Sequence, residues 1–373
     1  MHLLNQGHEV YGIDSFLRRQ LVRLRGSISA IPIPSMTIRQ HYIKKKFGNY
    51  HFRMMDITDH SGRLDMVFRE FKPESIVNLA QIPSAPYSMI DVDHANEVFI
   101  NNIKGLMNLI WLIREYVPNS PITTLGTMGE YEQPNMPIPE GFFKVSYRKK
   151  SDVMEFPKLG GSFYHVSKTA TSKILRYACR TWDIMGTDIM QGVVYGTTTE
   201  EMGNPPKSEL RTRFDFDDVF GTMINRACAC AIIGHPLIPY GTGMQTRAYI
   251  ALRDSIRCLA ISVENPPDES NSIHCYRVIN QFDESYSCND IANRVQKIAK
   301  DLGILSDIKH ISNPRVEKEV HYYNPEHEKL YKLGWKPTKT LNEEMKIMLE
   351  DLSQFKERIN HYRHKILPKV KWR

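Results

Sequence analysis

The feature that most constrains the fold is an alternation of short apolar runs with longer amphipathic segments through the first half of the chain. The apolar runs have the length of strands, whereas the amphipathic segments repeat their apolar residues every three or four positions, as helices do. Strands that alternate with helices in this way form a parallel sheet covered by helices, so the sequence predicts a doubly wound α/β domain. The expected strands are His8–Asp14, Tyr50–Ile57, Ser75–Ala80, Pro121–Thr127 and Thr187–Tyr195, and the expected helices are Ser61–Phe71, Ala95–Tyr116 and Phe163–Trp182.

The beginning of the chain reads as the middle of a structural unit. Met1–Gln6 is predicted to be the last part of a helix that Gly7 ends, and the strand His8–Asp14 follows it. In an NAD(P)-binding, Rossmann-like fold a strand and a Gly-rich turn come about 20 residues before the acid that ends this strand. No G-x-x-G-x-x-G run occurs in the sequence. We therefore expect the first strand and the Gly-rich turn to be missing from the chain as written.

The pattern changes after residue 192, where polar and proline-containing segments interrupt the alternation. Two further helices are expected there, at 218–234 and 342–362, with loops between them. We predict a Rossmann-like domain formed by residues 1–192 with 246–267. A smaller C-terminal substrate lobe would consist of residues 193–245 with 268–373.

Composition narrows the classes of partner. The net charge of +7 suits anionic small molecules, but the basic residues are scattered beside acidic ones, so we expect no nucleic-acid partner. The six cysteines show no zinc-ligand spacing and are interpreted as reduced thiols of a cytoplasmic protein without a metal site. No apolar run reaches the ~18 residues that a membrane span requires, so no membrane partner is expected either.

The candidate catalytic pair is Tyr164 and Lys168. Their spacing of four places both side chains on one face of the helix Phe163–Trp182. A lysine cation beside a tyrosine favours the phenolate and is expected to lower its pKa, so that the phenolate can accept a proton from a sugar hydroxyl. The spacing alone is a weak signal, because Tyr42 and Lys46 repeat it in a lysine-rich surface segment. The position of Thr127, at the end of an apolar strand, strengthens it.

Candidate cofactor residues lie at the ends of the expected strands. Asp14 ends its strand where an acid would bind the ribose hydroxyls of an adenosine, which favours NAD over NADP; the alternative is a turn aspartate. Arg18 and Arg19 follow closely and keep NADP open. Asp56 and Ile57 are placed to meet an adenine, and Asn102 is expected to brace the helix near Lys168.

Several runs together resemble the extended short-chain dehydrogenase/reductase family that acts on nucleotide sugars. The similarity extends from Gly7 to the C-terminal tail and is strongest to the members that join sulfite to a UDP-sugar. The runs that carry it are Ser84–Met89 (SAPYSM), Leu125–Tyr131 (LGTMGEY), Phe163–Lys168 (FYHVSK), Gln191–Gly196 (QGVVYG), Asn313–Glu317 (NPRVE) and His321–Tyr323 (HYY). One position departs from that group: Ile82-Pro83 stands where its synthases carry Gln-Arg.

The resemblance implies an enzyme with bound NAD that oxidises UDP-glucose at C4, eliminates water across C5 and C6, adds sulfite at C6 and reduces C4 again. Tyr164, Lys168 and Thr127 would serve the C4 step. Glu130 or His165 would be the C5 base, and a His165 cation would also attract sulfite. Further roles are implied for Met128 as a pocket residue, for Gln191 and Tyr87 as substrate ligands, and for Arg247 and Arg315 as a diphosphate clamp.

The resemblance also implies partners: free sulfite or a sulfite-donating protein, and a second copy of the chain in a homodimer. Two alternatives stay open at the level of sequence. One is a nucleotide-sugar 4-epimerase or dehydratase of the same family. The other is a degenerate, non-catalytic nucleotide-binding relative. The dehydratase is disfavoured because Met128-Gly129 occupies the place of the Asp-Glu pair that dehydratases carry after the threonine.

Overall fold

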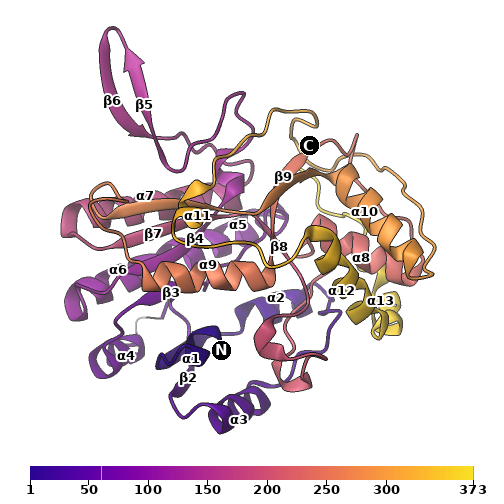
Figure 1. Ribbon diagram of the computed structural model, residues 1–373, viewed down its shortest axis with the longest axis horizontal. Helices are drawn as coiled ribbons and strands as arrows, with labels where there is room; N and C mark the ends of the chain where they lie inside the picture. Colours follow the sequence, from indigo (N-terminus) through magenta and orange to yellow (C-terminus); the bar gives the residue numbers. More distant parts are fainter. Residues whose placement is uncertain (60, 373) are drawn as a thin grey trace.

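A four-stranded parallel sheet forms the centre of the molecule in the computed structural model, which describes residues 1–59 and 61–372 (Figure 1). Its strand order is β10–β7–β4–β3, so neighbouring strands are joined by crossovers rather than by hairpins. Parallel order with helical crossovers is the doubly wound arrangement that the sequence predicts. The strands are β3 (Ile76–Asn78), β4 (Ile122–Thr127), β7 (Gly186–Gln191) and β10 (Tyr276–Gln281).

The first two strands form a parallel sheet of their own. β1 (Val10–Asp14) pairs with β2 (Tyr50–Met54) in register, Val10 opposite Tyr50 and Asp14 opposite Met54. Neither strand is hydrogen-bonded to β3, so among the described residues the α/β layer is divided into a two-stranded and a four-stranded part. Short helices surround the smaller part: α1 (His2–Asn5), α2 (Leu17–Leu24), α3 (Met36–Lys46) and α4 (Arg63–Phe71).

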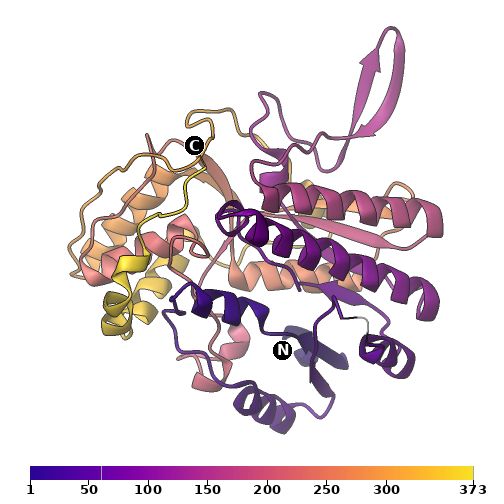
Figure 2. The ribbon, with the colours of Figure 1, turned by 180° about the vertical axis from the view of Figure 1, so that it is seen from behind.

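Two long helical segments cover one face of the central sheet and α9 (Leu252–Glu264) covers the other (Figures 1 and 2). The first segment is predicted as one helix and is continuous, but a π-helical turn at Ile100–Lys104 separates α5 (Val92–Phe99) from α6 (Gly105–Tyr116). The second is α7 (Phe163–Trp182), with the bounds that the sequence predicts. The core between α6, α7 and the sheet consists of apolar side chains from Ile57 to Phe282.

The expected strand Thr187–Tyr195 is wrong as a single element. Gly192 ends β7, and the chain continues as β8 (Val193–Tyr195) in a separate sheet with β9 (Thr246–Ala251) and β11 (Glu284–Ser287). A Cβ on Gly192 would lie 2.9 Å from the Ala248 carbonyl oxygen, so only glycine lets the chain change sheets here. The predicted boundary at residue 268 also differs, because β10 pairs with β7 in the central sheet.

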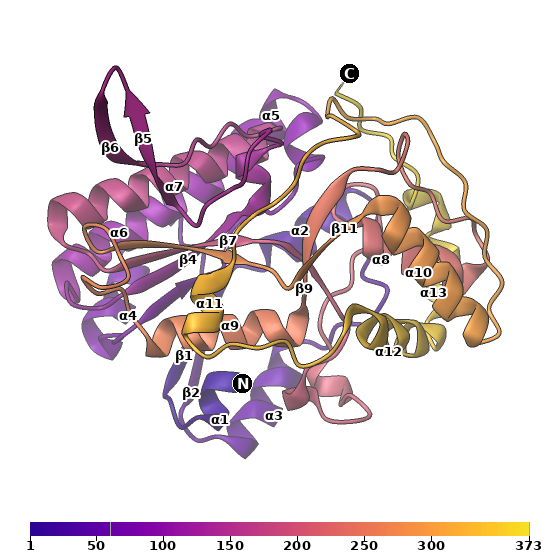
Figure 3. The same cartoon turned by 45° about the horizontal axis from the view of Figure 1, so that its top comes forward.

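The second lobe is a group of helices packed around α8 (Figures 1 and 3). α8 begins at Met223, five residues after the expected start, where the Thr222 side chain accepts a hydrogen bond from Asn225 N and caps it. The expected helix at 342–362 is two helices, α12 and α13. The lobe helices are α8 (Met223–Ile233), α10 (Cys288–Asp301), α12 (Leu341–Ser353) and α13 (Lys356–His361), and α11 (Glu328–Lys332) lies against the central sheet.

A hairpin that the sequence does not predict projects from the body beside the start of α7 (Figures 1–3). It consists of β5 (Phe142–Tyr147) and β6 (Lys150–Glu155), which pair only with each other. Its two turn residues, Arg148 and Lys149, have φ values of 47° and 65°. The sequence lacks the Asn-Gly or Asp-Gly that normally marks such a turn, which explains why the pattern does not reveal it.

All six cysteines are free thiols. Within residues 1–59 and 61–372, no helix is both long enough and apolar enough to cross a bilayer.

Candidate active site

The first turns of α7 carry the candidate catalytic pair. Ser162 caps the helix by accepting a hydrogen bond from His165 N, which sets the helix start at Phe163, one residue before Tyr164. Tyr164 is 9% exposed and Lys168 is 2% exposed, and the lysine Nζ lies 5.8 Å from the centre of the tyrosine ring. The spacing of four therefore places both groups on the buried face of the helix, as the sequence predicts.

Thr127 stands beside this pair because β4 ends there, opposite Gln191 on β7. The predicted direction of the tyrosine pKa is wrong. Burial raises the pKa of Tyr164, and the negative charge of Glu130 raises it further, whereas a hydrogen bond with the Thr127 side chain opposes both effects. Low polarity around the phenol outweighs the expected stabilisation of the phenolate by Lys168.

Lys168 is fixed by the strand behind it. Its Nζ donates a hydrogen bond to the Leu125 carbonyl oxygen at 2.6 Å. Burial lowers the pKa of Lys168 to about 8, although the negative charges of Glu130 and Asp188 oppose this shift. Lys168 is thus a cation at neutral pH that lies close to its titration.

His165 is neutral at physiological pH, contrary to the expectation that it carries a charge there. Burial lowers the pKa of His165 to about 3, and the cations of Arg315 and Arg247 contribute to the shift. Its Nδ1 lies 3.0 Å from Ser162 Oγ, and its Nε2 faces Gly129, where a Cβ would be only 2.4 Å away. A neutral imidazole next to the Thr127 strand end can accept a proton but cannot attract an anion by charge.

The other two residues of the Thr127 run face the protein interior. Glu130 is fully buried; its Oε1 accepts the Thr127 N–H at 3.0 Å, and its Oε2 accepts from Ser172 Oγ at 3.1 Å. Burial raises the pKa of Glu130 against the opposing cation of Lys158. Met128 is 5% exposed and packs in the core beneath the sheet edge. Both side chains therefore stabilise the Thr127 run from the protein interior.

Two arginines meet over Glu317. The Arg247 guanidinium forms an ion pair with the Glu317 carboxylate, and the same carboxylate acts on Arg315. The Arg315 guanidinium lies 5.8 Å from the ring centre of Tyr240. Because both arginines influence the pKa of His165, their positive potential reaches the mouth of the catalytic cluster.

Sequence reasoning missed a third arginine near this clamp. Arg226 is 4% exposed, lies 4.9 Å from the Tyr240 ring on the α8 side, and leaves its Nε without a hydrogen-bond partner. The signal was present in the sequence, because Arg226 is the one charged residue of the apolar helix Met223–Ile233. Buried guanidinium groups of this kind are costly unless an anion or a π face compensates them.

Gln191 and Tyr87 already have protein partners. Gln191 Nε2 donates to Gln281 Oε1 at 2.9 Å and to Ser255 Oγ at 3.2 Å, which ties the carboxyl ends of β7 and β10 together. Tyr87 is buried, and its hydroxyl donates to Glu97 Oε2 at 2.5 Å. Gln191 retains its amide oxygen for a ligand, whereas the Tyr87 ring is packed against Phe220 and His94 at 5.4 and 4.7 Å between ring centres.

The candidate cofactor residues of the two-stranded sheet lie at its carboxyl end. Asp14 is exposed; its Oδ1 accepts the Phe16 N–H at 2.7 Å, which leaves Oδ2 available to a ribose. Arg18 is already engaged, since its Nη2 donates to Asp215 Oδ2 at 2.7 Å and its guanidinium stacks on Phe220 at 4.2 Å. An arginine held in this way is not available for a 2′-phosphate, which favours NAD over NADP.

The remaining cofactor candidates shape the adjacent surface. Asp56 Oδ1 accepts from Thr58 N and Oγ1 at 2.8 Å, and Ile57 is buried against Gly105, whose missing Cβ would be 2.5 Å from Ile57 Cδ1. Asn102 braces two elements, because its Oδ1 accepts the Ile82 N–H at 2.8 Å and its Nδ2 donates to Ser167 Oγ at 3.0 Å.

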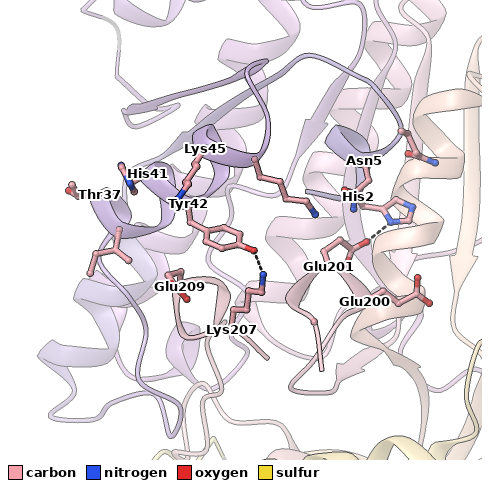
Figure 4. Close-up of a pocket in the computed structure, with 14 residues that line it drawn as sticks. His2, Asn5, Thr37, His41, Tyr42, Lys45, Glu200, Glu201, Lys207 and Glu209 are labelled. Atoms are coloured by element: carbon pink, nitrogen blue, oxygen red, sulfur yellow. Dashed lines mark hydrogen bonds and ion pairs between the residues drawn. The ribbon is translucent and has the colours of Figure 1, made fainter. Parts of the chain in front are cut away.

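A cavity of about 1150 Å³ lies elsewhere, between α1, α3 and residues 200–209 (Figure 4). Two of its charged side chains pair within the protein: His2 Nδ1 lies 2.6 Å from Glu201 Oε1, and Lys207 Nζ donates to Tyr42 OH at 2.7 Å. None of the candidate catalytic or substrate residues lines it. We therefore place the candidate site at the carboxyl ends of β4 and β7 and not in this cavity.

Comparison with known proteins bears on the whole chain. The model of the NAD dependent epimerase/dehydratase family matches residues 1–275. The UDP-sulfoquinovose synthase of Sulfolobus acidocaldarius is 44% identical over 375 residues, which cover 100% of this chain and 93% of that protein. The chloroplastic UDP-sulfoquinovose synthase of Spinacia oleracea is 38% identical over 377 residues, covering 100% of this chain and 76% of that protein.

Solved structures resemble the fold at low sequence identity. The UDP-glucuronic acid 4-epimerase from Bacillus cereus, in complex with UDP-glucuronic acid and NAD, matches with a TM-score of 0.67 at 18% identity and covers 94% of this chain and 93% of that chain. The dTDP-glucose 4,6-dehydratase from Bacillus anthracis, in complex with NAD, matches with a TM-score of 0.64 at 15% identity and covers 96% and 94%. At this identity the likeness concerns the fold alone.

Proposed function

The chain belongs to the NAD dependent epimerase/dehydratase family of extended short-chain dehydrogenases/reductases, and we propose that within it the protein is a UDP-sulfoquinovose synthase that converts UDP-glucose and sulfite. The observation that carries the proposal is the grouping of Thr127, Tyr164 and Lys168 in one buried cluster, next to the paired arginines Arg247 and Arg315. The full-length similarity to two synthases supports this choice among the activities of the family.

The residues present fit NAD at both of its ribose ends. Asp14 Oδ2 can bind the adenosine ribose, the engagement of Arg18 with Asp215 disfavours a 2′-phosphate, and we assign Lys168 to the second ribose. When bound, NAD supplies a hydride acceptor and donor. No glycine-rich turn for the pyrophosphate occurs among the described residues.

The residues of this chain act most directly in removing the proton of the sugar C4 hydroxyl. In this proposal the Tyr164 oxygen accepts the proton of the sugar C4 hydroxyl as a phenolate, a form that burial and Glu130 disfavour and that the Thr127 hydrogen bond and the Lys168 cation must stabilise. Lys168, a cation at neutral pH, stabilises the negative charge that passes through this pair. Positioned proton transfer of this kind contributes about 10²–10⁴-fold to a rate.

His165 is the better candidate for the C5 base. Once C4 is a ketone, the C5 proton is acidic, and its removal expels the C6 hydroxyl as water and leaves a C5–C6 double bond. The imidazole is uncharged and can take up that proton, although burial and the two arginines make it a weak base in this structure, whereas the Glu130 oxygens are already committed to Thr127, Ser172 and Lys158. Sulfite then forms its C–S bond at C6, and C5 regains a proton.

Since His165 is uncharged, we assign the attraction of sulfite to the field of Arg247 and Arg315, which also clamp the diphosphate. Sulfite would come from solution or from a sulfite-donating protein. We further propose a homodimer formed through α6 and α7, where Met107, Trp111 and Tyr177 are 37%, 49% and 56% exposed on neighbouring helices (Figure 2). Sedimentation velocity measures that state.

Product identity tests the proposal. Protein loaded with NAD is incubated with UDP-glucose, with and without sulfite, and the products are separated by mass spectrometry. The expected product with sulfite is a UDP-sugar with a sulfonate at C6, formed without net consumption of NAD. If only UDP-galactose or a stable 4-keto-6-deoxy sugar forms with sulfite present, the protein is an epimerase or dehydratase instead.

A further inference from the structure

A lysine that the reaction does not use is fully buried beneath the catalytic cluster. Lys158, in the loop between β6 and α7, has no exposed side-chain surface. Its Nζ lies 3.2 Å from Glu130 Oε2, 3.2 Å from Asp188 Oδ2 and 3.8 Å from Glu155 Oε1. Burying a lysine costs several kcal/mol unless its partners are well placed, and apolar side chains of similar volume often stabilise such sites at least as well. A buried ion pair therefore raises the question of a role beyond stability.

The carboxylates that Lys158 bridges lie against each other across β4. A Cβ on Gly126 would be 2.9 Å from Asp188 Oδ1 and 2.9 Å from Glu130 Oε1, so the two carboxylates flank the same glycine. Like charges at this separation in a dry interior repel strongly unless a cation lies between them. Lys158 is that cation, with equal distances to both. The Tyr276 hydroxyl donates the second hydrogen bond to Asp188, at 2.8 Å.

Glu130 connects Lys158 to the catalytic threonine. While Lys158 and Ser172 hold its Oε2, its Oε1 accepts the Thr127 N–H at 3.0 Å. Backbone hydrogen bonds join the same two segments, because Leu159 N and Gly160 N both donate to the Glu130 carbonyl oxygen, at 2.9 and 3.3 Å. Lys158 thus ties the end of β4 to the loop that begins α7.

The same charges act on the catalytic pair. Glu130 raises the pKa of Tyr164 after burial, and Glu130 and Asp188 oppose the lowering of the Lys168 pKa by burial. The charged and titratable groups that face Lys158 come from several elements: Glu130 and Tyr131 after β4, Asp188 on β7, Glu155 on β6 and Tyr276 on β10. Glu155 is separately paired with Lys173 and Arg176 on α7.

We propose that Lys158 is a positioning residue of the reaction, which bridges Glu130 and Asp188 so that Glu130 holds the Thr127 amide and the field of the two carboxylates at Tyr164 and Lys168 is balanced. The proposal rests on the proposed function for the roles of Thr127, Tyr164 and Lys168. Lys158 itself does not touch the substrate.

The first test uses no substrate. In Lys158→Met the Thr127 amide is expected to exchange its hydrogen at least about 10-fold faster than in the parent, because Glu130 Oε1 is released, while Ile122 and Thr123 on the same strand keep their protection. Hydrogen exchange followed by mass spectrometry or NMR measures this. Unchanged Thr127 protection in the folded variant overturns the proposal. This readout is independent of the product that the enzyme makes, so it does not fail with the synthase assignment.

The second test is the pH profile of turnover, whichever sugar product forms. Loss of the Lys158 cation makes the potential at Tyr164 and Lys168 more negative, so the profile of Lys158→Met moves to higher pH. Asp188→Asn removes a negative charge and moves it to lower pH. The double variant Lys158→Met/Asp188→Asn keeps the net charge and returns it towards the parent.

If Lys158 had a purely structural role, these variants would lose turnover without shifts of their pH profiles in opposite directions. That result would refute the proposal that Lys158 balances the charges of Glu130 and Asp188. Should Lys158→Met fail to fold, Asp188→Asn and the double variant still give the predicted order. If the pH profiles of Asp188→Asn and the double variant coincided, the proposal for Lys158 would be overturned.

Discussion

Tyr164 and Lys168 lie on one buried face of α7. Removing the Tyr164 phenol oxygen alone therefore tests the proposed proton transfer separately from substrate binding. Tyr164→Phe removes the phenol oxygen and leaves the ring. Turnover is expected to fall by about 10²–10⁴-fold because proton transfer is lost, while binding of the UDP-sugar changes little. Steady-state kinetics and calorimetric titration measure the two effects. Tyr147→Phe, on the exposed hairpin β5–β6, is the matched control, and near-parental turnover of a folded Tyr164→Phe would dismiss the assignment.

The spacing of these residues could be predicted from sequence, but their charge states could not. The four-residue interval predicts a shared face without any tertiary information. The pKa directions depend on what covers that face, and Ser88, Leu125 and Glu130 lie 34 to 80 residues away from the pair in the sequence. For the same reason Lys158 gave no signal, since nothing local distinguishes it from a surface lysine.

The arginine clamp predicts an effect on affinity rather than on chemistry. Arg247→Ala and Arg315→Ala each remove charge-assisted hydrogen bonds to a diphosphate, which are worth roughly 1.5–3 kcal/mol, about 10–150-fold in KM. Because such contacts persist in ground and transition states alike, kcat should change little. Arg148→Ala at the hairpin tip is the control. Unchanged KM in both clamp variants would place the diphosphate elsewhere.

His165 predicts a pH dependence of stability. Its pKa is about 3 in the folded protein against 6.5 for an ordinary histidine, so the unfolded chain takes up a proton first as the pH falls. The contribution of His165 is therefore complete above about pH 6.5 and is lost progressively towards pH 3. In His165→Gln the free energy of unfolding, measured by urea denaturation, should fall less steeply over this range. Parallel curves for parent and variant would mean that His165 is already charged when folded.

At the scale of elements, the turn from β4 into the 3₁₀ segment Met128–Tyr131 is built tightly against α7. A Cβ on Gly129 would meet His165 Nε2 at 2.4 Å, so Gly129→Ala must displace either the imidazole or the Thr127 turn. Overpacking of this kind costs about 1–3 kcal/mol, and turnover should fall at least about 10-fold because both groups belong to the site. Gly48→Ala, where a Cβ has nothing within 4 Å, is the control. Full activity of Gly129→Ala would show that the imidazole is free to move.

Elements with a strong periodicity were predictable and those defined by partners were not. α7 has the expected bounds because twenty residues of helical pattern follow a capping serine. β8 and β10 could not be assigned, because which sheet a short apolar run joins depends on distant neighbours. The hairpin β5–β6 escaped prediction because charged residues occupy its turn.

At the scale of the molecule, the proposed site draws its residues from two distant parts of the chain. The central sheet supplies Thr127 and the Tyr164 helix, whereas the segments after residue 240 supply Arg247 and Arg315. The segment that carries Arg315 is held by the end of the chain, since Arg315 lies 5.4 Å from the Trp372 ring and Trp372 N donates to the Pro314 carbonyl oxygen at 3.1 Å. The division into two lobes after residue 192 stays a prediction, and the sequence pattern did not reveal that β10, within 268–373, pairs with β7 in the central sheet.

The projecting hairpin has a practical consequence. Arg148 and Lys149 are exposed at its tip, and trypsin cleaves after such residues, so brief digestion should nick the chain there before anywhere in the packed body. The two fragments would stay together, because β4 belongs to the first and its neighbour β7 to the second. The nicked protein should elute in gel filtration at its original volume and retain activity. Separation of the fragments without denaturant would show that the hairpin holds the molecule together. If they remain associated, the tip is a place where a tag or a label can be inserted without disturbing the enzyme.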